Sequence, residues 1–211
     1  MIDKYLVSNC LFIIDEFNER YCNIENDKLK EIANEEYSEA DLVVRLGYPF
    51  RHMATFNMQG KARDIVVKNK DFIVEVKYLK NFKSNSNGRS NKITWSEGFE
   101  KDFNWLTDEI KEKNKGNRAF VIGWFNVQNR KFGDVMQIGT KAGQNPLINK
   151  DRISLFPFLN YNPKTCKTSD VTYRYGEAFK ELNISIAGVE EHVSCMFLGK
   201  ETDLFHFAIY W

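Results

Sequence analysis

The chain has 211 residues and a formal net charge of +1, and 43% of its residues are hydrophobic. Its 17 Phe, 9 Tyr and 4 Trp can build a core, which argues against a disordered chain and for one domain, or one domain with a sizeable appendage. Because the net charge is close to zero, no field over the whole molecule would attract a polyanion, and any nucleic-acid-binding surface would be a local patch.

No apolar run approaches the roughly 20 residues that a transmembrane helix needs. The amino-terminal segment is interrupted by Asp3, Asp15 and Glu16 and lacks a basic start, so we expect no signal peptide. The 4 Cys are widely spaced without a CxxC motif and the chain has 3 His, so neither a zinc site nor a disulfide framework is expected. These features together predict a cytoplasmic protein with free cysteines.

Two helical segments are predicted before the first strand. The first has an apolar stripe at three- and four-residue steps, formed by Leu6, Cys10, Ile13, Ile14, Phe17 and Tyr21. Residues 27–46 are also in helical phase, and we expect a break at Ser38, because Ser38 and the residues up to Asp41 can form a capping box that begins a second helix. Gly47 and Pro49 then end that helix.

The middle of the chain is predicted to form a β-hairpin, a helix and a buried strand. Two β-branched runs within residues 64–77 flank the polar tetrapeptide KNKD. Thr94 and Glu97 form a capping-box pattern at the start of a helix. The apolar stripe of this helix is Trp95, Phe99, Phe103, Leu106 and Ile110. Residues 118–127 are almost continuously apolar, as in a strand covered on both faces, so the order strand, helix, strand implies a right-handed parallel crossover.

The character of the chain changes toward its carboxy-terminal end. Residues 134–140 are expected to form a further strand. Short aromatic β-like runs follow at 152–159, 171–176, 192–199 and 204–211, and the last two are predicted to pair as a hairpin. We therefore predict an α/β fold in which residues 1–145 form a core with amino-terminal helices and residues 146–211 form a β-rich extension packed on it.

The predicted hairpin carries its charged residues on one face. A two-residue or a four-residue turn within KNKD gives the same register, in which Asp64 lies directly opposite Glu75. Because side chains alternate along a strand, Asp64, Glu75 and Lys77 share one face. The other face is apolar and consists of Ile65, Val67, Phe72, Val74 and Val76.

Two opposed carboxylates indicate a bound cation. The Cβ atoms of directly opposed residues lie about 4.5–5.5 Å apart, and like charges at that separation destabilise a strand pair. Oxygen ligands without His or Cys nearby favour Mg²⁺ or Mn²⁺ over zinc. Lys77, two residues after Glu75, can reach a metal-bound water or a substrate phosphate. Such an assembly suits phosphodiester hydrolysis, because the metal lowers the pKa of water and neutralises charge on the phosphoryl group.

Asp64, ten intervening residues and then Glu75-Val76-Lys77 on a β-hairpin resemble the active site of the PD-(D/E)XK nuclease superfamily. This superfamily has the restriction-endonuclease-like fold, a mixed central sheet flanked by helices. Its usual proline before the first Asp is replaced here by Arg63. The family core is a helix, a three-stranded meander, a helix and a strand, and residues 27–140 follow this order if one short strand is added. The resemblance covers about half of the chain.

The resemblance implies further metal ligands. Family members often carry a Glu on the helix before the hairpin. Glu39 is the first candidate, because it shares a helix face with apolar residues, and Glu36 is the second, because it falls on the stripe of one continuous helix. The backbone carbonyl of Val76 would also ligate the metal. Family members often place a Gln, Glu or Lys on the following helix, where Lys101 and Glu97 are the candidates.

The Glu-x-Lys spacing by itself is weak evidence, because 28% of the residues are charged. Glu109-Ile110-Lys111 has the same spacing on a predicted helix, where we expect the charges to face solvent. The alternative interpretation of the hairpin is a surface structure with a cross-strand salt bridge, and its apolar neighbours argue against that exposure. The basic loop 81–92 either contacts phosphates or is a surface loop, and its cations, with the lysine before it, are Lys80, Lys83, Arg89 and Lys92.

The resemblance implies a metal-dependent endonuclease, a hydrolase acting on DNA more than on RNA. Asp64 and Glu75 would hold Mg²⁺ or Mn²⁺, Lys77 would position or activate the attacking water, and Glu39 would assist. Residues 146–211 would position the substrate, form a homodimer interface or dock a protein partner. The alternatives left open are a nuclease toxin or defence effector controlled by a protein partner, an RNA-directed enzyme, and an inactive nucleic-acid-binding module, against which the intact Asp64, Glu75 and Lys77 argue.

Overall fold

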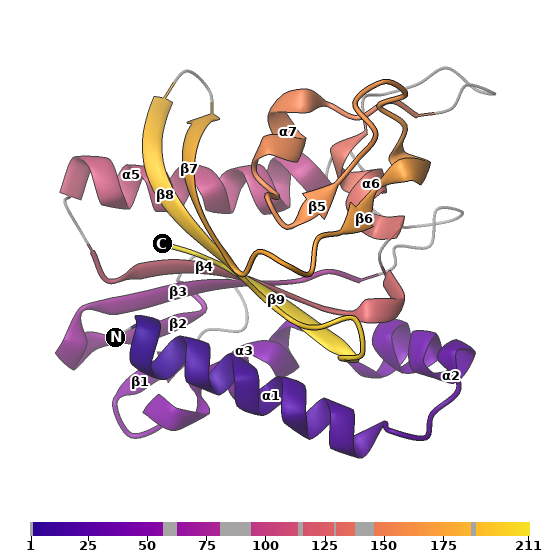
Figure 1. Ribbon diagram of the computed structural model, residues 1–211. Helices are drawn as coiled ribbons and strands as arrows, with labels where there is room; N and C mark the ends of the chain where they lie inside the picture. The colour runs from indigo at the N-terminus through magenta and orange to yellow at the C-terminus, as the bar shows by residue number, and fades with distance from the viewer. Residues whose placement is uncertain are drawn as a thin grey trace.

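A seven-stranded mixed sheet lies at the centre of the molecule, and helices cover both of its faces (Figure 1). The computed structural model describes residues 2–56, 63–80, 94–113, 116–128, 130–137, 146–186 and 189–211. The strands are β1 Ala54–Phe56, β2 Ile65–Val67, β3 Phe72–Tyr78, β4 Arg118–Phe125, β7 Phe179–Ile186, β8 Val189–Leu198 and β9 Phe205–Tyr210. Their spatial order is β1-β2-β3-β4-β9-β8-β7, with β3 and β4 parallel and the other neighbours antiparallel. The predicted α/β class is confirmed.

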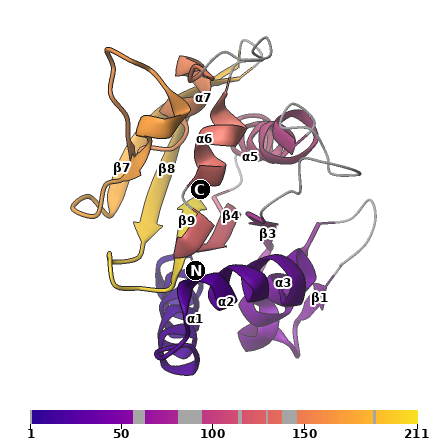
Figure 2. The same ribbon diagram turned by 90° about the vertical axis from the view of Figure 1, so that its right-hand side faces the viewer.

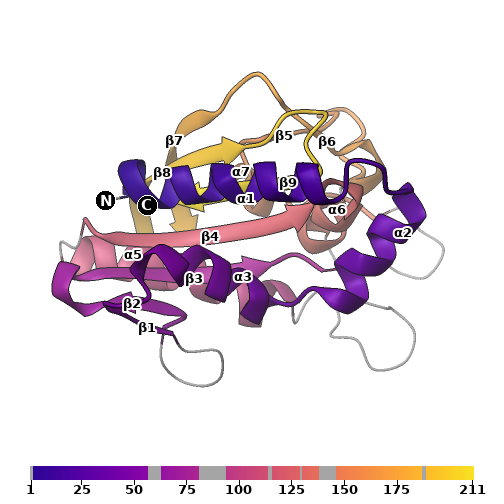
Figure 3. The same ribbon diagram turned by 90° about the horizontal axis from the view of Figure 1, so that it is seen from below.

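Helices α1 to α3 lie on one face of the sheet and α5 to α7 on the other (Figures 1 and 2). Their bounds are α1 Val7–Arg20, α2 Asn26–Glu31, α3 Glu39–Gly47, α5 Glu100–Lys113, α6 Arg130–Met136 and α7 Lys150–Ser154. Short π-helical segments are Ile2–Leu6, Ile32–Glu36 and Trp95–Phe99. Seen from below, α1 runs along β9 and α3 along β3 (Figure 3). Within the described ranges, no helix has the length and apolar character to cross a membrane.

The predicted break between the amino-terminal helices at Ser38 is confirmed. The Ser38 hydroxyl accepts a hydrogen bond from the Asp41 N–H at 3.3 Å, and the Ser38 N–H donates to the Asp41 carboxylate at 2.9 Å. This reciprocal capping box satisfies two backbone donors that a helix start leaves without intrahelical partners. Helix α3 therefore begins at Glu39, which is held in its first turn.

The hairpin of β2 and β3 has the predicted register. Ile65 pairs with Val74 and Val67 pairs with Phe72, so the four residues KNKD form the turn. Asp71 closes the turn with a left-handed backbone (φ 46°). Strand β2 pairs with β3 only as far as Val74, whereas β3 continues to Tyr78. The second half of β3 therefore extends beyond the end of β2.

Helix α5 connects β3 to the parallel strand β4, as predicted, and every residue of β4 is buried. The predicted capping box at Thr94 is wrong. Thr94 has helical dihedral angles (φ −58°, ψ −41°), and its side chain makes no capping hydrogen bond. An N-cap side chain reaches the next turn from an extended backbone, which Thr94 does not have.

The expectation that Glu109 faces solvent is also wrong. Glu109 is buried, and its carboxylate accepts a hydrogen bond from Arg118 Nε at 2.8 Å. Arg118, the buried first residue of β4, also donates to the Asp71 carboxylate at 3.0 Å. A buried guanidinium needs carboxylate partners, which explains why α5 carries an inward-facing Glu at this position. Lys111 is exposed, as predicted.

Two segments predicted as strands are helical. Residues 134–136 belong to α6, where Phe132, Val135 and Met136 are buried at helical spacing, and residues 138–140 lie outside the described residues. Most of residues 152–159 form α7 and a turn, because the Asn149 side chain accepts hydrogen bonds from two N–H groups and caps the helix. The β-structure at 152–159 and 171–176 is limited to β5 Leu159–Asn160 and β6 Thr172–Tyr173.

The hairpin predicted across residues 200–203 is confirmed by the pairing of β8 with β9. The sequence does not predict strand β7, because most of its side chains between Phe179 and Ile184 are exposed and it lacks the aromatic runs of its neighbours. Strand β9 pairs with β4 from Phe125 to Phe120. The carboxy-terminal strands thus continue the sheet that β1 to β4 begin.

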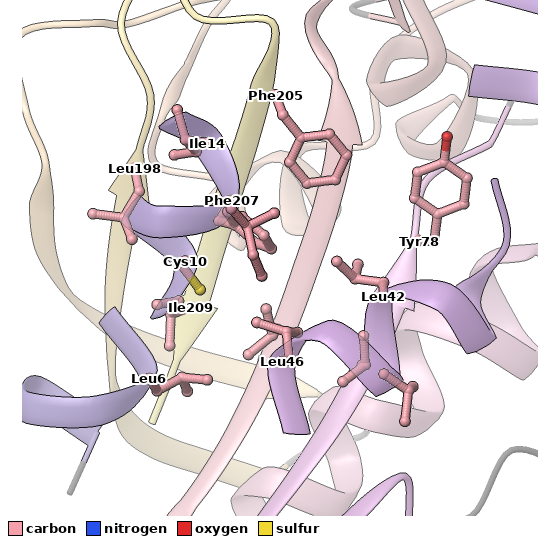
Figure 4. Packing of buried hydrophobic residues seen from close by; sticks show 14 of the residues in the cluster. Leu6, Cys10, Ile14, Leu42, Leu46, Tyr78, Leu198, Phe205, Phe207 and Ile209 are labelled. Atoms are coloured by element: carbon pink, nitrogen blue, oxygen red, sulfur yellow. The ribbon is translucent and has the colours of Figure 1, made fainter. Parts of the chain in front are cut away.

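Two hydrophobic cores lie on opposite faces of the sheet. The first packs α1 and α3 against the sheet and includes Leu6, Cys10, Ile14, Leu42, Leu46, Phe207 and Ile209 (Figure 4). The second is rich in aromatic side chains and packs α5, α6 and α7 against the other face. The apolar face of the hairpin, with Val74 and Val76, belongs to the first core. The charged face of the hairpin therefore points toward α5.

The hairpin between β8 and β9 offers a test of the fold at Gly199. Gly199 has φ +152°, and a Cβ there would lie 2.2 Å from the buried His206 ring. Gly199→Ala should lower the free energy of unfolding by about 2–4 kcal/mol, because overpacking adds to backbone strain. Chemical denaturation measures this change. Gly176→Ala is the matched control, because a Cβ there meets nothing within 4 Å, and a loss as large in that variant would contradict the assignment.

Candidate active site

Asp64 and Glu39 accept hydrogen bonds from backbone N–H groups of β3, on the part of its edge that lies beyond its pairing with β2. The Val76 N–H donates a hydrogen bond to Asp64 Oδ2 at 2.8 Å, and the Tyr78 N–H donates to Glu39 Oε2 at 3.4 Å. Backbone N–H groups on a sheet edge need acceptors when no strand covers them. Asp64, the residue before β2, and Glu39, at the start of α3, supply these acceptors, so both lie beside the last residues of β3.

Glu75 and Lys77 project from the face of β3 that points toward α5. The Glu75 side chain is 10% exposed and forms an ion pair with Arg63, whose guanidinium lies 4.6 Å from the centre of the Trp105 ring. Arg63, the residue before Asp64, thus places a cation beside Glu75. The guanidinium is held by its ion pair with Glu75 and by a cation–π contact with the Trp105 ring.

The Lys77 ammonium group lies between two carboxylates. Its Nζ is 3.2 Å from Glu39 Oε2 and 3.5 Å from Asp102 Oδ2. Burial by itself lowers the pKa of Lys77, but the charges of Glu39 and Asp102 outweigh burial and raise the pKa above its ordinary value. Lys77 therefore stays charged at neutral pH, and its position is fixed by two helices.

Asp102 is a site residue that the sequence analysis missed. It lies on α5, is 5% exposed, and burial raises its pKa to about 6 despite the nearby Lys77 charge. Its neighbours Glu97 and Lys101, the candidates named for this helix, are exposed. A signal was present, because Asp102 is three residues after Phe99 and four before Leu106, which is the spacing of the buried stripe.

The pKa of Asp64 is raised to about 8. Burial is the main cause, and the Val76 N–H opposes it by stabilising the charged form. The charge of Glu75 and a hydrogen bond between the two carboxyl groups raise the pKa further. Asp64, which the hairpin register places opposite Glu75, therefore keeps its proton at neutral pH.

The structure also places the Val76 carbonyl and the two candidates for the upstream acid. Val76 has its side chain in the first core, and because the N–H and C=O of a residue in a strand point to the same side, its carbonyl faces the edge occupied by Asp64. Of the two upstream acids, Glu39 contacts the site, whereas Glu36 is exposed at the end of its π-helix. The cations predicted at 81–92 lie outside the described residues.

The donor set is limited to a few oxygens. In the part of the chain that the structure describes, no three His, Cys, Asp or Glu side chains are grouped to ligate one metal ion. Glu39 and Asp102 are directed to Lys77, which leaves Asp64, Glu75 and the Val76 carbonyl as the candidate ligand oxygens. Mg²⁺ commonly takes one or two protein carboxylates and completes its shell with water and phosphate oxygens, so this small set fits that ion.

Comparison of the chain with models of known protein families, with curated proteins and with solved structures gives no match.

The raised pKa of Asp64 predicts an unusual pH dependence of stability. Its value is about 8 in the folded protein and about 4 in an unfolded chain, so between these values the folded state binds the extra proton. The stability contributed by this proton is complete below about pH 4 and is lost as the pH rises toward 8. In metal-free buffer at pH 8, Asp64→Asn should therefore raise the free energy of unfolding by about 1–3 kcal/mol.

Urea denaturation of both proteins between pH 4.5 and 8.5, in the presence of chelator, measures this difference. The increase in the free energy of unfolding caused by Asp64→Asn should become smaller toward pH 4.5, because the wild-type Asp64 side chain is protonated there and is neutral like Asn. Asp108→Asn, an exposed position on α5, is the control and should change stability by less than about 0.5 kcal/mol. An Asp64→Asn variant that is less stable than wild type at pH 8 would contradict the assignment.

Proposed function

We propose that the chain is a metal-dependent endonuclease with a restriction-endonuclease-like core, acting on DNA more than on RNA. One observation carries the proposal: the carboxyl groups of Asp64 and Glu75 lie close enough to interact beside the second half of β3, together with the fixed ammonium group of Lys77. The element order supports it, because α3, the antiparallel strands β1 to β3, α5 and the parallel strand β4 follow the order of the superfamily core. In this proposal β1 is the short strand that the sequence did not reveal.

Asp64, Glu75 and the Val76 carbonyl would hold the Mg²⁺ or Mn²⁺ ion. When bound, the ion would supply positive charge at the phosphoryl oxygens and lower the pKa of water. Asp64 would give up its proton to become a ligand, because only the ionised carboxylate binds a metal strongly. In the metal-free protein Arg63 supplies the positive charge beside Glu75.

Lys77 would act as a charged hydrogen-bond donor. Because Glu39 and Asp102 raise its pKa, the amine has no free electron pair at neutral pH with which to accept a proton from water. A fixed ammonium group can instead orient the attacking water and stabilise the negative charge that develops on the phosphate. Of the two roles expected for this lysine, positioning is therefore the better supported.

Glu39 and Asp102 would be positioning residues. Each holds the Lys77 ammonium, one from the start of α3 and the other from α5. Fixed partners on two different helices restrict the motion of a long side chain, and such restriction is what a catalytic group needs before substrate arrives.

Incubation with supercoiled plasmid tests the proposal. The wild-type chain should nick the plasmid with Mg²⁺ or Mn²⁺ and leave it intact with chelator. Glu75→Gln should lower the nicking rate by at least about 10²-fold, because a metal that stabilises transition-state charge contributes several kcal/mol. Gel electrophoresis of the plasmid forms over time gives the rates, and a labelled RNA of matching sequence in parallel compares the two substrates.

Glu190→Gln is the matched control, because it removes the same charge from an exposed position on β8. It should nick at the wild-type rate. Equal activity of wild type and Glu75→Gln would assign the cleavage to a contaminant or another site and would overturn the proposal. Metal-independent cleavage by both would do the same.

A further inference from the structure

Arg63 is a cation that contacts a candidate metal ligand. Its guanidinium donates a hydrogen bond to Glu75 Oε1 and forms an ion pair with this carboxylate. Within the described ranges, Glu75 is the one carboxylate with which Arg63 pairs. The side chain that would bind a metal ion is therefore already neutralised by a cation of the chain itself.

The two cations of the site are held in different ways. Lys77 lies between two carboxylates, one on α3 and one on α5, and keeps both of them whatever binds to Glu75. The second contact of Arg63, the Trp105 ring on α5, carries no charge. When another cation engages Glu75, no other carboxylate of the described residues is in place to neutralise Arg63.

Charge makes Arg63 and a metal ion compete for Glu75. An ion bound to either carboxylate oxygen would lie within about 7 Å of the guanidinium, given the usual lengths of metal–oxygen and charged hydrogen bonds. The Glu75 side chain is 10% exposed, so water screens this repulsion only in part. The two cations therefore oppose each other even where the ion takes the oxygen that Arg63 does not contact.

The surroundings of Arg63 allow it to leave Glu75. Its side chain is 34% exposed, so the guanidinium has access to water. Trp105 is buried and fixed in position, and a planar guanidinium can turn over an aromatic face while it stays in contact with the ring. Arg63 can thus release the carboxylate without losing its second contact.

We infer that Arg63 is a resident counter-ion of the metal site, which an ion must displace from Glu75 in order to bind. The inference rests on the proposed function, because it takes Glu75 as a metal ligand. Arg63 neutralises the buried carboxylate in the metal-free chain and lowers the affinity of the site for the ion. It also selects against Na⁺ and K⁺, because these ions carry no more charge than the guanidinium that they would replace.

Calorimetric titration with MgCl₂ at pH 7 tests the inference without substrate and without turnover. Arg63→Met should bind Mg²⁺ at least about tenfold more tightly than wild type, because the repulsion between the two cations is gone. Arg63→Lys keeps the charge and should bind within about threefold of wild type. A side chain that only supports the fold would not change the affinity for Mg²⁺ in this direction.

Arg51→Met is the matched control. The Arg51 guanidinium also lies over an aromatic ring, at 4.5 Å from the centre of the Tyr48 ring, and pairs with no carboxylate of the described residues. This variant removes the same charge and the same kind of cation–π contact away from the candidate ligands. It should bind Mg²⁺ like wild type.

A second measurement uses the wild-type chain and does not depend on the folding of Arg63→Met. The ¹⁵N NMR signal of the Arg63 Nε–H group, assigned by its loss in Arg63→Lys, reports on the guanidinium. It should shift during the Mg²⁺ titration and reach half of its change at the calorimetric Kd. NaCl at the same ionic strength should leave the signal in place.

An unchanged or weaker affinity for Mg²⁺ in Arg63→Met, or an Arg63 signal that stays in place at saturating Mg²⁺, would overturn the inference. It and the proposed function fail separately. Plasmid nicking without tighter Mg²⁺ binding in Arg63→Met removes the counter-ion alone. Tighter binding in this variant without nicking by wild type removes the nuclease and leaves a metal site controlled by Arg63. Absence of Mg²⁺ binding in every protein would overturn both.

Discussion

The short pairing between β2 and β3 is the constraint on which the rest of the site depends. β3 continues to Tyr78 while its pairing with β2 stops at Val74, so the second half of β3 has backbone groups on one edge that no strand of the described residues covers. Asp64 and Glu39 accept the hydrogen bonds of the Val76 and Tyr78 N–H groups. The hydrogen bonds that these backbone N–H groups need thus bring Asp64 and Glu39, from two separate elements, next to Glu75 and Lys77 of β3.

Burial then decides how these charges behave. Charged groups withdrawn from water are tolerated when they are paired, and the site pairs Lys77 with Glu39 and Asp102, and Glu75 with Arg63. Asp64 is left beside another carboxyl group without a cation of its own among these pairs, and it holds a proton with a pKa of about 8. A divalent ion would replace that proton. The proposed metal therefore follows from Asp64, the carboxyl group that none of the cations in these pairs neutralises.

The sequence predicted the parts of the structure that follow from local patterns. Alternating apolar residues and the four-residue turn determined the register of Asp64 and Glu75, and the Ser38 capping box located Glu39. Asp102 was missed because its importance depends on packing: only contact between α5 and β3 brings it to Lys77. The strand predictions for the segments that form part of α6 and α7 are wrong because short apolar runs suit either structure, and the Asn149 cap and the burial of Phe132 decide between them.

Proton release on metal binding tests the central claim most directly. Calorimetric titration of the chain with Mg²⁺, in buffers of different ionisation enthalpy, gives the number of protons released for each ion bound. At pH 7 about one proton should be released, because Asp64 carries it below a pKa of about 8, and at pH 9 the number should fall toward zero. Asp64→Asn should release none. Binding at pH 7 without proton release, or binding that is equally tight in Asp64→Asn, would contradict the account.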